Sequence, residues 1–127
     1  MKIISFAWTS EAFKAGRKTV TRRKWSHEYA QRFKKGDICQ AFDRQPRYGG
    51  KRIGYLKIVK DLYWECISDM PDSDFEAEGF AFMKEQKLKI WGEKPEIAFA
   101  NWKKTKDYYW VIRFKKIDME DLNGFIF

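Results

Sequence analysis

The sequence has few of the side chains on which several classes of enzyme site depend. His27 is the only histidine among 127 residues, and the two cysteines, Cys39 and Cys66, lie 27 positions apart with no CxxC pair. His27 follows a probable helix cap, which indicates a surface residue, so a Ser-His-Asp or Cys-His site is excluded, as is a His/Cys metal site. We interpret both cysteines as reduced core thiols of a cytoplasmic protein, with a disulfide as the alternative.

Long hydrophobic runs are also absent. The apolar run at residues 3–8 has six residues and is broken by Ser5, which is too short for the hydrophobic region of a secretory signal. No segment approaches the roughly 20 apolar residues that a membrane-spanning helix needs. We therefore expect no contact with a membrane.

Apolar and aromatic residues are abundant enough for a folded core. They make up 44% and 18% of the chain, which argues against disorder although 35% of the residues are charged. A chain of this length is close to the usual size of one domain. We expect one domain at residues 1–117, and a tail at residues 118–127 whose role the sequence does not indicate.

Positive charge is concentrated in one segment. Residues 14–35 contain nine Lys or Arg and one acid, and this local charge of +8 equals the net charge of the whole chain. The other 105 residues carry 17 bases and 17 acids. Such an uneven distribution predicts a docking surface for an anionic partner, with a solvated lysine-rich face as the alternative.

The order of expected elements is typical of an α+β fold. Alternating or β-branched residues predict strands at residues 2–6, 19–23, 38–42, 52–59, 63–67 and 108–116. Capping and turn residues predict short helices at residues 10–15, 26–35, 74–79, 82–91 and 95–102, the third opened by a capping box of Ser73 and Glu76. We expect a small barrel of about five to six strands decorated by short helices, and no parallel doubly wound sheet.

The basic segment also carries a motif. The stretch that begins Ala15-Gly16-Arg17-Lys18-Thr19-Val20-Thr21-Arg22 resembles the G-x-K-x-x-x-x-R signature of the ASCH family, a branch of the PUA-like barrels. Further similar features follow in the same order over residues 1–117: the Gly36-Asp37 turn, the Gly54 strand, Glu78-Gly79-Phe80 and Val111-Ile112-Arg113-Phe114. The resemblance implies a PUA-like fold.

One departure from that signature bears on function. Many ASCH members carry Glu where this chain has Thr21, and the Lys-Thr-x-Thr-x-Arg form resembles the branch of bacterial N4-acetylcytidine amidohydrolases. That resemblance implies a catalytic set of Lys18, Thr21 and Glu78, with no metal and no cofactor. The chain is longer than those enzymes over residues 82–106, which affects the roof of any pocket and hence its substrate.

The residue chemistry leaves two interpretations of this set open. A threonine nucleophile needs a base, and neighbouring cations favour the neutral, basic form of Lys18. Lys18 and Thr21 would face opposite sides of a regular strand, so the chain must be irregular between them. Alternatively, Lys18, Arg22 and Glu78 form a structural ion-pair cluster at the mouth of the barrel, and Thr21 only favours a strand.

A binding module without catalysis is the second functional hypothesis. Cations contact phosphates and aromatic rings stack on unpaired bases, and a basic flap at residues 44–52 adds further charge. The residues expected to bind RNA or another single-stranded nucleic acid, or a modified nucleoside or nucleotide, are Arg17, Lys18, Arg22, Arg23, Lys24, Arg47, Tyr48 and Arg52. The candidate stacking residues are Trp8, Trp25, Tyr29, Tyr48 and Tyr55. Cleavage of single-stranded RNA in the same cleft is a third possibility.

Overall fold

The computed structural model describes residues 1–118, so the predicted tail lies outside the described residues except for Asp118. The strands are β1 (Ile3–Ser5), β2 (Val20–Arg23), β3 (Ile38–Phe42), β4 (Arg52–Ile58), β5 (Tyr63–Cys66) and β6 (Tyr108–Ile117). The α-helices are α1 (Ser10–Lys14), α2 (His27–Ala30), α3 (Asp74–Ala77), α4 (Phe80–Glu85) and α5 (Pro95–Lys103). Among these helices, none combines the length and apolar character that a membrane crossing requires.

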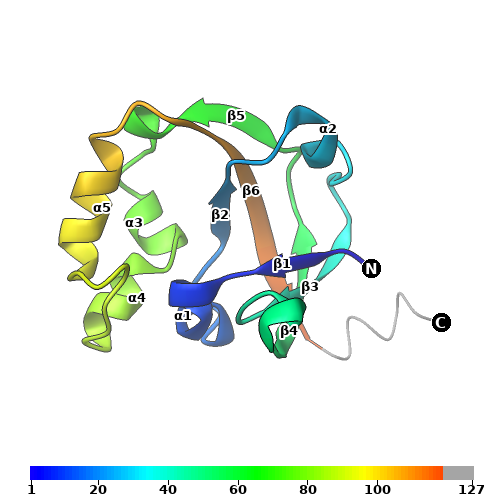
Figure 1. The fold of residues 1–127 in the computed structure, drawn as a ribbon, viewed down its shortest axis with the longest axis horizontal. Helices are drawn as coiled ribbons and strands as arrows, with labels where there is room; N and C mark the ends of the chain where they lie inside the picture. Colours follow the sequence, from blue (N-terminus) through cyan, green and yellow to red (C-terminus); the bar gives the residue numbers. More distant parts are fainter. Residues whose placement is uncertain (119–127) are drawn as a thin grey trace.

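The long strand β6 organises the sheet. The strand order is β1-β3-β4-β6-β2, with β5 also paired to β6. Strand β1 runs parallel to β3, and the other pairs are antiparallel. The result is a mixed, barrel-like sheet of six strands that does not close, and helices α3, α4 and α5 gather together on one side of it (Figure 1). The predicted α+β class is confirmed.

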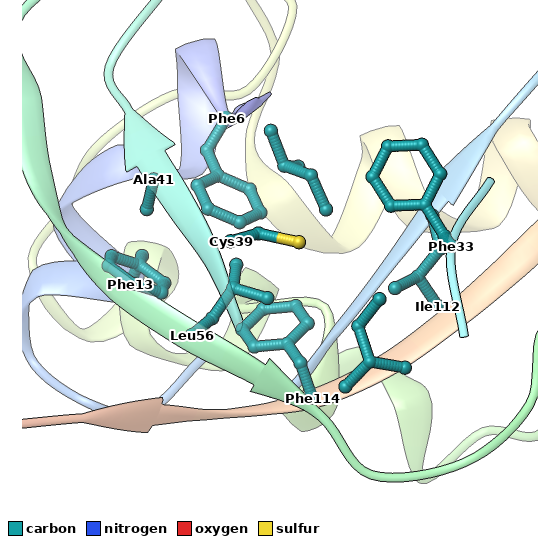
Figure 2. Packing of buried hydrophobic residues seen from close by; sticks show 10 residues of the cluster. Phe6, Phe13, Phe33, Cys39, Ala41, Leu56, Ile112 and Phe114 are labelled. Carbon is teal, nitrogen blue, oxygen red and sulfur yellow. The ribbon is translucent and has the colours of Figure 1, made fainter. Parts of the chain in front are cut away.

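Two apolar cores meet at helix α1. The first fills the sheet and includes Phe6, Phe13 and Phe114, whose rings pack within 6.0 Å of one another (Figure 2). The second lies between the helices α3 to α5 and α1. Neighbouring residues of α1 contribute to both, because Phe13 belongs to the first core and Ala12 to the second. Helix α1 therefore connects the sheet to the helical side of the molecule.

Three local predictions were wrong. Helix α2 ends at Ala30 and does not reach residue 35; Phe33 instead packs into the sheet core. Helix α4 begins at Phe80 and ends at Glu85, and Lys87 beyond it adopts a positive φ of 56° that a helix cannot continue. The capping box is not formed, because Ser73 has helical dihedral angles and Glu76 binds Arg17.

Cys39 and His27 lie where the sequence predicts, whereas Cys66 was expected in a core and is not part of one. Cys39 is buried in the sheet core, Cys66 is half-buried, and both are free thiols. His27 is exposed, and its ring packs on Trp64 and Trp110 at the outside of the sheet. Within residues 1–118, no three His, Cys, Asp or Glu side chains are grouped closely enough to hold a metal ion.

Candidate functional site

A cleft of about 220 Å³ lies where the sheet meets the helical side of the molecule. Its floor is polar and its walls are aromatic, although both lie next to the apolar cores. The floor residues are Lys18, Thr21, Arg22, Arg23 and Glu78, and the aromatic wall residues are Phe6, Trp8, Phe80, Trp91, Trp102 and Tyr109. All three residues that the amidohydrolase resemblance singles out therefore line one cleft.

An irregular segment after α1 brings Lys18 to this floor. Gly16 adopts a positive φ of 76°, and the backbone N–H groups of Arg17 and Lys18 both donate to the carbonyl of Ala12. Strand β2 starts only at Val20, so the alternation of side chains along a strand does not separate Lys18 from Thr21. The irregular entry that their shared role requires is thus present.

Gly79 brings Glu78 to the same place from the other side. Its φ is +93°, and a Cβ atom at this position would lie 2.6 Å from the Cβ of Ala12 and 3.4 Å from the Cβ of Lys18. Only glycine lets the junction between α3 and α4 pack this closely against α1. Glu78, which ends α3, is held against Lys18 as a consequence.

Lys18, Arg22 and Glu78 form a buried ionic cluster. The Nζ of Lys18 donates to the Oε1 of Glu78 at 3.0 Å and to the Glu78 carbonyl at 2.7 Å, and Nη1 of Arg22 donates to Oε2 at 2.7 Å. Lys18 is 2% exposed and Glu78 is 3% exposed. The ion pairs that the structural interpretation predicts therefore exist, and they exist at the floor of a cleft.

A second layer of charges supports this cluster, and the sequence analysis did not identify it. Nη2 of Arg22 also donates to Asp74 at 2.5 Å and to Glu65 at 3.0 Å. Arg113 donates to Asp74 at 2.9 Å and 3.1 Å, and to the hydroxyl of Tyr63 at 3.0 Å. A sequence signal for this layer existed, because a cation between the apolar residues of a strand, as Arg113 is, needs a partner.

Burial and pairing set the pKa values of the cluster. Burial lowers the pKa of Lys18, an effect that Glu78 opposes by attraction and hydrogen bonding and that Arg23 and Arg22 reinforce by repulsion. Burial also lowers the pKa of Arg23, with Glu78 acting in the opposite direction. Burial would raise the pKa of Asp74, but hydrogen bonds from Arg113 and Arg22 outweigh it and the pKa is lowered. Burial thus disfavours the charged form of both Lys18 and Arg23, and of these two only Lys18, an amine, can serve as a base.

The Thr21 hydroxyl is not engaged by its neighbours. Thr21 is 1% exposed and lines the cleft, yet its hydroxyl makes no hydrogen bond to any residue in 1–118. The Nζ of Lys18 is directed to Glu78 instead. This leaves Thr21 available to a ligand.

Five of the eight residues predicted to bind nucleic acid lie outside the lining of the cleft. Arg17 pairs with Glu76 and Glu85 at 2.7 Å each, and Lys24 pairs with Asp107 at 3.0 Å. The guanidinium groups of Arg47 and Arg52 lie over the rings of Tyr48 and Tyr55. Much of the charge of residues 14–35 is therefore matched by carboxylates that are distant in the sequence.

Arg23 is different from the other cations of the floor. It donates hydrogen bonds to the carbonyls of Ser5 and Arg22, and its guanidinium lies 5.9 Å from the ring of Phe6. In the part of the chain that the structure describes, no carboxylate pairs with it. Arg23 is therefore a half-buried cation without a matching anion.

The aromatic walls come mostly from residues that the sequence analysis did not name. Of the five candidate stacking residues, Trp8 lines the cleft, whereas Trp25 and Tyr55 pack inside and Tyr29 and Tyr48 are exposed elsewhere. Trp91, Trp102 and Tyr109 form a continuous wall, with ring centroids 5.4 Å and 5.7 Å apart. Trp91 is half exposed and has a φ of +52°, a strained conformation for a bulky residue. Two of these rings, Trp91 and Trp102, come from residues 82–106, the segment that was expected to affect the roof of the pocket.

Comparison with known proteins extends the fold assignment. No family model and no curated protein matches the chain. Among solved structures, the chain is similar to protein EF3133 from Enterococcus faecalis V583, a member of the family DUF984, with a TM-score of 0.58 and 18% identity over 92% of this chain and 80% of that one. The shared fold agrees with the α+β class expected from the sequence. At this identity the likeness concerns the fold alone.

Proposed function

We propose that the cleft binds one unpaired nucleotide, with the base between the aromatic walls and a phosphate at Arg23. The observation that carries the proposal is the combination of a wall of three aromatic rings with a half-buried arginine that has no carboxylate partner within residues 1–118. Aromatic rings stack on any base, and an arginine fork binds phosphate.

Size and polarity support a small ligand. The cleft volume of about 220 Å³ is below the range of about 300 to 1,000 Å³ that drug-sized ligands occupy, which suits a single nucleotide or nucleoside. The Thr21 hydroxyl can donate to or accept from a base edge. Lys18 and Glu78 hold each other in place, so the floor is ordered before a ligand arrives.

Calorimetric titration tests this proposal. The probes are the four ribonucleoside 5′-monophosphates and N4-acetylcytidine, titrated into wild type and two tryptophan variants. Trp91→Ala removes a wall ring and should weaken binding about tenfold or more, because stacking on one base contributes roughly 1 to 3 kcal/mol. Trp64→Ala removes an equally exposed tryptophan outside the cleft and should change nothing. An equal loss in both variants, or no saturable binding of any probe, would refute the proposal.

Deacylation of an N4-acylated cytidine is a second candidate function. It is favoured by the Thr21 hydroxyl, which is free to react, and by the lowered pKa of Lys18 three residues before it. In this mechanism neutral Lys18 accepts the proton of Thr21, and the hydroxyl oxygen attacks the acyl carbon. The bond between the acyl carbon and N4 then breaks, Lys18 returns its proton to N4, and cytidine leaves. Water hydrolyses the ester on Thr21 and releases the acid. A neutral Lys18 can keep both of its donations to Glu78, and its lone pair would then accept the proton of Thr21.

Two conservative variants separate the two candidates. Thr21→Val keeps the shape but removes the nucleophile, and Lys18→Arg keeps the charge but cannot act as a base. If the protein is a hydrolase, both should reduce turnover of N4-acetylcytidine by orders of magnitude while affinity changes little. If it only binds, Thr21→Val should weaken binding by about 0.5 to 1.5 kcal/mol, the contribution of one hydrogen bond. Release of shorter chains from single-stranded RNA would instead assign a ribonuclease.

A further inference from the structure

We infer that the ligand is a single-stranded nucleic-acid chain of at least two nucleotides, which continues from the cleft across Ser5 into a second, cationic pocket. This inference rests on the proposed function, because it takes the first nucleotide to lie in the cleft. It adds a second subsite and a class of ligand, a polymer in place of a free nucleotide.

The second pocket adjoins the cleft. It has a volume of about 390 Å³ and is built from β1, the segment of α2 and the residues after it, and the turn at Pro46–Tyr48. Ser5 belongs to the lining of both pockets. Strand β1 thus lies between the two pockets at Ser5, and a chain that leaves the cleft over Ser5 would reach the second pocket.

The second pocket has the composition expected for a nucleotide subsite. Lys2 and Arg32 line it together with the exposed ring of Tyr29, and its lining contains no carboxylate. The guanidinium of Arg32 lies 5.6 Å from the Tyr29 ring, and Arg32 has no carboxylate partner in residues 1–118. Lys2 has only a loose pair with Asp37 at 3.6 Å. Cations beside an accessible ring suit a phosphate and a stacked base.

Arg23 lies at the junction of the two pockets. Its side chain lines the cleft and donates to the carbonyl of Ser5, the residue that both pockets share. A phosphodiester that joins a nucleotide in the cleft to a nucleotide in the second pocket must pass this point. Such a phosphate would supply the anion that Arg23 lacks within the described residues, and it would do so in a half-buried place where pairing is strong.

The aromatic residues favour a nucleic acid over an acidic peptide. Both partners would satisfy Lys2, Arg23 and Arg32, but only a nucleic acid offers flat bases to the walls of the cleft and to Tyr29. Arg23 lines the cleft beside Ser5 and Arg32 lines the second pocket, so each set of rings has a cation near it for a sugar-phosphate backbone. We therefore assign the path from the cleft to Tyr29 to a single strand.

A length series tests the inference. The probes are 5′-phosphorylated random-sequence RNAs of one, two and four nucleotides, titrated into wild type, Arg32→Glu and Lys115→Glu. Lys115→Glu is the matched control, since it makes the same charge change at an exposed site that lines neither pocket. In wild type and the control, affinity should rise at least tenfold from one to two nucleotides. In Arg32→Glu this rise should disappear, while the affinity for the mononucleotide stays within twofold of wild type.

The salt dependence of the dinucleotide provides a second readout. Each phosphate contact on a single strand contributes about 0.7 to the slope of log affinity against log salt, so Arg32→Glu should lower the slope by about that amount. Equal affinity for all lengths in wild type would overturn the inference and leave the proposed nucleotide site intact. Binding of none of the probes would overturn both. Competition by polyglutamate as strong as by RNA would also overturn it, in favour of an acidic peptide.

Discussion

The sheet core and the ionic cluster are equally buried but are stabilised in opposite ways. Phe13 in the core is 0% exposed and Glu78 in the cluster is 3% exposed. Burial of an aromatic ring is favourable by itself, whereas burial of Lys18, Arg22, Asp74 and Glu78 costs desolvation that their mutual attraction only partly offsets. An apolar filling of the same space would be at least as stable. Stability alone therefore does not account for a buried ionic cluster at this place.

The cations of residues 14–35 also fall into two groups, those that pair with a carboxylate and those that have no such partner within residues 1–118. Arg17, Lys18, Arg22 and Lys24 each pair with a carboxylate within 3.0 Å, so they hold elements together. Arg23 and Arg32 have no such partner within residues 1–118. A high local charge in the sequence therefore indicates the neighbourhood of an anion site, and pairing in the fold identifies which cations remain for a ligand.

The largest expected effect is in the sheet core. Phe13→Ala removes a ring that packs on Phe6 and Phe114, and the cavity should lower the free energy of unfolding by about 4 kcal/mol. Urea unfolding followed by tryptophan fluorescence measures the loss. Tyr48→Ala, a change of similar size at an exposed ring, should cost less than about 0.5 kcal/mol. Similar losses in the two variants would contradict the assignment of the core.

A nearly equal loss of stability is expected from a change in the ionic cluster. Glu78→Gln keeps the shape but leaves Lys18 and Arg22 without the carboxylate that they share, which should cost about 3 kcal/mol at neutral pH. The matched control is Glu76→Gln, two residues earlier, whose exposed pair with Arg17 should contribute only about 0 to 1 kcal/mol. If the two losses are the same, the cluster is not buried as described.

A single methyl group added at Gly79, where the two regions meet, should lower the free energy of unfolding. Gly79→Ala places a Cβ atom 2.6 Å from Ala12 at a φ of +93°, and clash and strain together should cost about 2 to 3 kcal/mol. Gly16→Ala is the control, since its φ of +76° is also positive but no atom lies within 4 Å of the added Cβ. Its cost should be about 1 kcal/mol. Thermal unfolding of both variants checks whether close packing, and not φ alone, requires glycine at position 79.

Alkaline pH should lower the stability contributed by the sheet core and raise the stability contributed by the ionic cluster. Burial raises the pKa of Cys39 in the sheet core to about 11 from 9.0. Between these two pH values the unfolded chain holds fewer protons than the folded chain, so stability falls as the pH rises. The loss should reach about 2 kcal/mol at pH 11. Burial lowers the pKa of Lys18, so above this lowered pKa the unfolded chain holds more protons and stability rises with pH.

Unfolding of wild type, Cys39→Ala and Lys18→Met between pH 7 and 11 separates these contributions. Cys39→Ala should lose less stability than wild type above pH 9. Lys18→Met should lose more than wild type over the same range, because the gain from Lys18 is missing. Parallel pH profiles for the three proteins would show that neither group is buried in the folded state.

Part of the candidate site was predictable because it is local. Gly16, Lys18 and Thr21 lie within six residues, and a glycine followed by β-branched residues predicts an irregular entry into a strand. Glu78 came only from the resemblance to the ASCH family, since no local signal connects it to residues 60 positions away. Trp91 and Trp102 were missed because aromatic residues look the same in sequence whether they pack in a core or line a cleft. Arg113 carried a signal, a cation between the apolar residues of a strand, but nothing local identifies Asp74 as its partner.

Local patterns in the sequence predict most of the elements and the place where charge accumulates. Alternation fixes β6, Pro95 starts α5, and Gly36 and Gly79 end or join elements, because turns and periodicity depend on a few neighbouring residues. Only the tertiary structure decided which cations are neutralised and which line a pocket. Arg22 and Arg23 are adjacent in the chain, yet three carboxylates bind the first and none within residues 1–118 binds the second. Pairing depends on groups 40 to 60 residues away, and only folding brings them within hydrogen-bond distance.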